Sequence, residues 1–141
     1  MVASELGKGR LLFCSSEAFA RGIFGKPVGD QNTANLHSNM KSWLVRESDK
    51  ETKVKAVQLG KVNDLNGLDK DKTVVVCIGN FSSALKRREE IFEFVKKGGG
   101  FLVAFRPWFW KQQIQNDTEK EEFDRLVKEF LEPMGKLSLL K

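Results

Sequence analysis

The chain has 141 residues, of which 40% are apolar and 30% are charged, with a net charge of +5 and two cysteines. This length fits one domain with its own core, and this composition excludes collagen-like, disordered and disulfide-stapled proteins. The apolar runs are far shorter than the ~20 residues of a membrane span, and the N-terminus lacks the pattern of a signal peptide. We therefore expect a soluble cytoplasmic protein with reduced thiols.

Four runs have the character of strands, at residues 10–14, 54–59, 73–78 and 101–105. The last two are continuously apolar, which is typical of strands buried on both faces of a parallel sheet.

Helical spacing of apolar residues appears three times. The three stripes are Leu36, Met40, Trp43 and Leu44; Leu85, Ile91, Phe92 and Val95; and Phe123, Leu126, Val127, Phe130 and Leu131. We expect the first helix to be capped by Asn32 or Thr33, the second by Ser82–Ser83, and the third to end before Pro133. Residues 136–140 form either a last short strand or a tail. Strands that alternate with helices predict an α/β domain with a small, mostly parallel sheet.

In such sheets, ligands bind at the carboxyl ends of the strands. Cys14 ends the first strand, shortly before Glu17, and would need a base such as His37, the one histidine, to act as a nucleophile. Glycines that would permit a strained nucleophile turn are missing, since Phe13 and Ser15 flank the cysteine. We therefore interpret Cys14 as a core thiol and His37 as a helix-surface histidine, and expect no catalytic residue.

A second strand end carries a weak signal for anion binding, in Gly79, Asn80, Ser82 and Ser83. A glycine turn before a helix N-terminus can hold an anion through free amides. No complete phosphate-binding motif is present, so ordinary turn and capping roles are the favoured interpretation.

The last predicted strand is followed by Arg106, Trp108 and Trp110. Tryptophan and arginine are enriched among the residues that dominate protein interfaces, so this segment is the candidate for partner binding. Burial of both tryptophans against the end of the sheet is the alternative.

Other ligand classes have little support. One histidine and two distant cysteines cannot form a structural zinc site, and we expect no metal and no cofactor. Basic residues are mostly interleaved with acidic ones, which is typical of solvated helices and does not favour nucleic acid, although weak binding of anions or nucleic acid stays an alternative.

Three segments resemble the TRP channel-associated factors. Residues 9–17 (GRLLFCSSE), 39–44 (NMKSWL) and 94–110 (FVKKGGGFLVAFRPWFW) are similar to that family's G-R strand, its W-L helix and its GGG strand followed by W-x-W. The chain departs from the family pattern at Ser16, where the family has histidine, and at residues 104–107, where it has Gly-Gly-Gln-Ala. The family's metallopeptidase-like portion is absent from these 141 residues.

The resemblance implies a flavodoxin-like three-layer sandwich, related to class I glutamine amidotransferases, over residues 1–141 as one domain of a larger architecture. It also implies a non-catalytic protein that binds a TRP-type cation channel and influences its trafficking and gating. We accordingly expect a cytoplasmic interaction domain that a channel partner recruits to the plasma membrane. The alternative is a cysteine-dependent amidotransferase or hydrolase that uses Cys14, and the oligomeric state is left open.

Overall fold

The computed structural model describes residues 2–24, 31–45, 54–79, 81–104, 116–125 and 128. The strands are β1 (Val2–Leu6), β2 (Gly9–Cys14), β3 (Lys55–Gln58), β4 (Thr73–Ile78) and β5 (Gly100–Ala104). The helices are α1 (Glu17–Arg21), α2 (Gln31–Leu44), α3 (Phe81–Lys86), α4 (Arg88–Lys96) and α6 (Asp117–Arg125), with short 3-10 turns η1 (Gly22–Phe24), η2 (Leu59–Lys61) and η3 (Leu65–Gly67).

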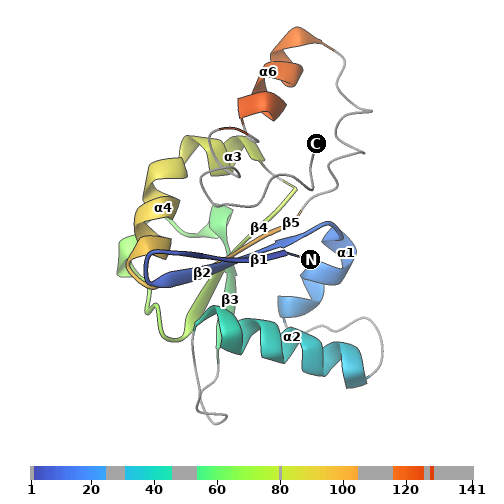
Figure 1. The fold of residues 1–141 in the computed structure, drawn as a ribbon, viewed down its shortest axis with the longest axis vertical. Helices are drawn as coiled ribbons and strands as arrows, with labels where there is room; N and C mark the ends of the chain where they lie inside the picture. Colours follow the sequence, from blue (N-terminus) through green and yellow to red (C-terminus); the bar gives the residue numbers. More distant parts are fainter. Residues whose placement is uncertain are drawn as a thin grey trace.

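The strands form one sheet in the order β1-β2-β5-β4-β3 (Figure 1). The four strands from β2 to β3 are parallel, and β1 pairs antiparallel with β2. The predicted α/β fold with a small, mostly parallel sheet is confirmed, and its layering is consistent with a flavodoxin-like sandwich. Strand β1 was not predicted, because VASEL contains no continuous apolar run.

Two apolar cores cover the two faces of the sheet. Alternate residues of the strands point to opposite faces, so Val75 and Cys77 of β4 enter one core while Val74 and Val76 enter the other. The first core includes residues of α3 and α4, and the second includes residues of α1 and α2, which lie on opposite sides of the sheet in Figure 1. Burial on both faces explains the continuously apolar sequences of β4 and β5.

Two helix predictions need correction. Leu36 in α2 is 44% exposed, so it does not belong to the buried stripe, although Met40 and Leu44 do. The second predicted helix is split into α3 and α4 at Arg87, and α3 begins at Phe81, so the Ser82–Ser83 pair lies inside its first turn and does not precede it. The apolar side chains predicted for the third helix, and residues 129–141, lie outside the described residues.

Arg87 lies at the junction of α3 and α4, and its side chain anchors the connection between β3 and β4. Its guanidinium donates hydrogen bonds to the Leu59 and Val62 carbonyl oxygens at 2.9 and 2.6 Å, and to both carboxylate oxygens of Glu90 at 3.0 and 2.9 Å. Glu90 Oε1 also accepts a hydrogen bond from the Leu65 amide at 3.0 Å. This Arg87–Glu90 clasp fixes η2 and η3 to α4.

Three consecutive glycines, Gly98 and Gly99 before β5 and Gly100 at its start, each have a separate structural reason. Gly98 has φ +116°, a conformation that side chains disfavour. A Cβ at Gly99 would lie 2.4 Å from the Phe94 ring, and one at Gly100 would lie 2.8 Å from the Leu44 carbonyl oxygen. The backbone conformation requires glycine at position 98, and close contacts require it at positions 99 and 100. These glycines therefore have structural roles.

Replacing Gly100 by alanine should destabilise the fold. The new methyl group would force β5 and α2 apart, and overpacking of this kind costs about 1–3 kcal/mol in the free energy of unfolding. Gly67→Ala is the matched control, because a Cβ there meets nothing within 4 Å. Urea unfolding of both variants measures the effect, and equal stability of Gly100→Ala and wild type would contradict the packing of Gly100 on Leu44.

The clasp should make stability depend on pH. The hydrogen bond from Arg87 lowers the pKa of Glu90 below its ordinary value, so the carboxylate form stabilises the fold. This stabilisation is complete above about pH 5 and is lost as the pH falls through the lowered pKa. Loss of hydrogen bonds to this charged group in Glu90→Gln should cost about 1–2 kcal/mol at neutral pH.

Thermal melts of wild type, Glu90→Gln and the control Glu93→Gln from pH 7 to pH 3 measure this dependence. The difference between wild type and Glu90→Gln should shrink as the pH falls below about 4.5, where an ordinary glutamate begins to be protonated. A difference that stays constant over the whole range would contradict a stabilising Glu90 carboxylate.

Candidate functional site

The carboxyl ends of β2, β5 and β4 lie next to one another and form the rim where α/β sheets bind ligands. The Gly79 amide donates a hydrogen bond to the Ala104 carbonyl oxygen at 3.1 Å, which ties the end of β4 to the end of β5. The Glu17 carboxylate at the start of α1 lies beside Gly79, since a Cβ there would be 3.3 Å from Glu17 Oε1. The chain segments after β2 and β4 therefore meet across β5.

Cys14 has no catalytic partner among the residues that the structure describes. It is a free, buried thiol, 4% exposed, and its Sγ donates to the Ser16 carbonyl oxygen at 3.3 Å. Ser16 itself is the N-cap of α1, where its hydroxyl accepts the Phe19 amide. Cys14 is thus the core thiol that we predicted.

His37 is buried in the protein, and the prediction of a helix-surface histidine is wrong. It is 4% exposed, its Nε2 lies 2.7 Å from the Phe19 carbonyl oxygen, and its ring lies 4.6 Å from the Phe19 ring. Gly22 makes room for the imidazole, because a Cβ there would lie 2.3 Å from His37 Cε1. Nδ1 is also buried and has no hydrogen-bond partner in the described part of the chain. His37 therefore packs against α1 and η1 and forms no pair with Cys14.

The predicted anion site has two features that oppose an anion at Gly79. The Gly79 amide is already engaged by Ala104, and the Glu17 carboxylate beside it repels negative charge. Asn80 and the side chain of Ser82 lie outside the described residues, and Ser83 is half-buried at the edge of a neighbouring cavity.

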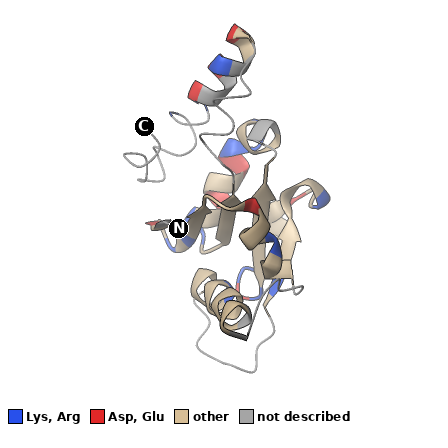
Figure 2. Ribbon diagram, turned by 90° about the vertical axis from the view of Figure 1, so that its right-hand side faces the viewer, with Lys and Arg blue, Asp and Glu red and all other residues tan. Residues whose placement is uncertain are grey.

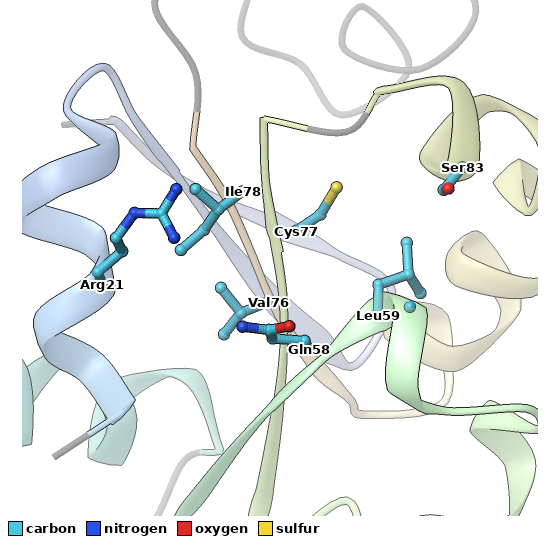
Figure 3. Close-up of a pocket in the computed structure, with 8 residues that line it drawn as sticks. Arg21, Gln58, Leu59, Val76, Cys77, Ile78 and Ser83 are labelled. Carbon is cyan, nitrogen blue, oxygen red and sulfur yellow. The ribbon is translucent and has the colours of Figure 1, made fainter.

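That cavity, of about 270 Å³, lies at the ends of β3 and β4 (Figure 3). We call it the rim cavity; it is lined by Arg21, Gln58, Leu59, Gly60, Val76, Cys77, Ile78 and Ser83. In Figure 3 the Arg21 side chain extends from α1 toward Ile78, and the Gln58 amide lies below it. The lining combines one cation, an amide, a hydroxyl and apolar walls.

A second hollow, of about 710 Å³, follows the outer edge of β3. We call it the β3 groove; it is lined by Arg21, Phe24, Ala56, Val57, Gln58, Lys61 and Val62. It shares Arg21 and Gln58 with the rim cavity, so the two hollows adjoin at the carboxyl end of β3.

The electrostatics of this region differ from those of the molecule as a whole. In Figure 2 basic and acidic residues are both distributed along the helices and turns. In the two hollows, by contrast, the charged lining residues are Arg21 and Lys61, both exposed and both without an ion pair among the described residues. This local excess of positive charge favours an anionic group.

Sequence reasoning missed Arg21, Gln58 and Lys61. They come from α1, β3 and η2, and only the packing of η1 beside β3 brings them together. The one available signal was Gln58, a polar residue at the carboxyl end of a predicted parallel strand. The predicted partner residues Arg106, Trp108 and Trp110 lie outside the described residues.

The motifs that suggested a family meet at the opposite end of the sheet. The Arg10 guanidinium at the start of β2 lies 4.7 Å from the centroid of the Trp43 ring, and its Nη1 donates to the Trp43 carbonyl oxygen at 3.0 Å. Arg10 also pairs with Glu5 of β1, at 3.3 Å. Leu44, next to Trp43, packs on Gly100. Residues from the G-R strand, the W-L helix and the GGG strand thus form one structural cluster.

The family model TCAF_N, described as "TRPM8, N-terminal domain", matches residues 1–141. The chain belongs to the TRP channel-associated factor family. In this TRP channel-associated factor domain, the contacts among Arg10, Trp43 and Gly100 show that part of the family pattern supports the fold. Comparison with curated proteins and with solved structures gives no match.

Among the described residues, no group of three or more histidine, cysteine or carboxylate side chains could hold a metal ion. None of their helices has both the length and the hydropathy of a membrane span.

The burial of Cys14 predicts a slow thiol. In a Cys77→Ala background, Cys14 of the folded protein should react with a disulfide reagent about a hundredfold or more slowly than in denaturant, because a buried thiol reacts only after opening of the structure. The time course of thiolate release measures both rates. Comparable reaction rates of Cys14 in the folded and denatured chain would contradict its burial and would support Cys14 as a nucleophile.

Proposed function

We propose that this domain is a non-catalytic protein-interaction module that binds a TRP-type cation channel and regulates its trafficking. The observation that carries the proposal is membership in the TRP channel-associated factor family along the whole chain. The site geometry is compatible with it, because neither Cys14 nor His37 has the partner that catalysis requires within the described structure.

The contact residues in this proposal are Arg106, Trp108 and Trp110. They follow β5 closely in the sequence, and β5 ends at Ala104 between the ends of β2 and β4. Large aromatic side chains and arginine supply much of the binding energy of protein interfaces. Weak anion binding at Gly79, Asn80, Ser82 and Ser83 belongs to the less favoured alternative.

The cellular arrangement is part of the same proposal. Residues 1–141 act as one amidotransferase-like domain, which resides in the cytoplasm and reaches the plasma membrane through the channel. The two cores on either side of one sheet support a single folding unit.

Binding to the cytoplasmic segments of a cold-sensing TRP channel tests the proposal. Truncation of both aromatic anchors in Trp108→Ala/Trp110→Ala should weaken binding by about thirtyfold or more, since even one interface anchor contributes ~2 kcal/mol or more. The variant Trp108→Phe/Trp110→Phe is the matched control, because it keeps aromatic surface and should retain most of the affinity.

Folding of each variant is checked by circular dichroism before binding is measured. A folded double-alanine variant that binds like wild type would remove these tryptophans from the interface. Absence of binding by the wild-type domain would contradict the channel-binding function itself.

A further inference from the structure

Strand β3 is an edge strand with one open side. It pairs with β4 alone among the described strands, and β4 lies on its inner side. The Lys55 amide donates a hydrogen bond to the Lys72 carbonyl oxygen at 2.7 Å. The backbone N–H and C=O groups of Lys55 therefore point toward β4. Backbone polar groups alternate along a strand, and those of Ala56 and Gln58 therefore face outward. An incoming extended segment would find the Ala56 amide, the Ala56 carbonyl and the Gln58 amide there, whereas the Gln58 carbonyl, at the N-cap of η2, accepts the first hydrogen bond of that turn.

The β3 groove gives this edge the shape of a binding channel. Phe24 of η1 lines it from one face of the sheet, and Val62, after η2, lines it from the other. Phe24 packs on the α1–α2 core and Val62 on the α3–α4 core, so both walls are anchored in the domain. The Arg87 clasp further holds the η2 wall through the Val62 carbonyl oxygen.

Charge selects the kind of segment that fits. Arg21 and Lys61 both line the groove and have no ion pair in the described structure, and exposed Lys55 lies on β3 itself. Among the described residues that line the groove none is acidic, and Glu17 lies against Gly79 on the rim. Acidic side chains on an added strand would meet these cations.

We propose that the open edge of β3 binds an extended acidic peptide of a partner protein by strand addition. The Ala56 amide and carbonyl and the Gln58 amide supply the main-chain hydrogen bonds, and Arg21 and Lys61 pair with carboxylates of the peptide. Main-chain pairing gives affinity and the charges give selectivity, as in other cases of strand addition. This surface includes none of the residues assigned to channel binding above. The proposal is therefore independent of the channel-binding function.

A second copy of this domain is the less suitable occupant. Pairing of β3 with β3 would bring Arg21, Lys55 and Lys61 of two chains to the same edge. Like charges in such an interface destabilise it, so charge favours an acidic peptide over self-association.

Fluorescence anisotropy with a short labelled peptide of alternating glutamate and valine tests the proposal on the full chain. Ala56→Pro removes one outward amide without removing the Lys55 amide that bonds to β4, and proline is tolerated at a strand edge of this kind. Arg21→Glu/Lys61→Glu reverses the groove charge. Lys8→Glu is the control for a charge reversal outside the groove, since Lys8 is exposed in the β1–β2 turn at the other edge of the sheet; it lowers the net charge by two, where the double variant lowers it by four.

We expect saturable binding of the peptide by wild type. Ala56→Pro and Arg21→Glu/Lys61→Glu should each weaken it by about tenfold or more, whereas Lys8→Glu should stay within about twofold. Thermal melts verify that each variant is folded. A peptide with lysine in place of glutamate should not bind.

Three results would overturn the proposal. One is failure of the wild type to bind the acidic peptide. Another is unchanged binding by folded Ala56→Pro, which would mean that charge alone attracts the peptide. The third is a wild-type dimer in sedimentation analysis that Ala56→Pro converts to a monomer, which would show that a second copy occupies the edge.

Discussion

The structure depends on the burial of β5 between two cores. All five residues of Gly100–Ala104 are buried, and β5 pairs with β2 on one side and β4 on the other. A strand in this position must be apolar on both faces, and its start must be glycine because Leu44 lies against the backbone. Its central place brings the ends of β2 and β4 together at the rim and leaves β3 as the open edge.

Local sequence patterns predicted the strands well because burial on both faces leaves a strong signal. The observed β4 has the predicted bounds, and β2, β3 and β5 differ from prediction by at most one residue at either end. The features that were missed depend on distant contacts. Leu36 was expected to be buried and His37 exposed, and the structure shows the reverse. Gly22 leaves room for the His37 imidazole, and no hydropathy pattern within α2 reveals this. Similarly, Arg87 at the α3–α4 junction binds carbonyl groups more than 20 residues away, which no local pattern reveals.

In the candidate site too, features set by local sequence were predicted and features set by distant contacts were not. Cys14 and its burial followed from its own strand, since a cysteine that ends an apolar run is usually a core residue. The cationic groove did not follow, because Arg21 and Lys61 belong to unrelated segments whose proximity arises from packing of η1 and η2 around β3. Family resemblance pointed to Arg10, Trp43 and the glycines, and the contacts show these residues supporting the sheet at the end opposite the rim.

The two proposals rest on different parts of the chain. The residues proposed for channel binding follow the central strand β5 in the sequence. The edge strand β3 carries outward-facing backbone groups beside two cations.

Residue-resolved hydrogen exchange tests the arrangement of the sheet most directly. The amides of β5 should exchange only through global unfolding, and in β3 those of Lys55 and Val57 should be protected while those of Ala56 and Gln58 exchange rapidly. Uniform protection along β3, or rapid exchange in β5, would contradict a sheet with β5 at its centre and β3 at an open edge.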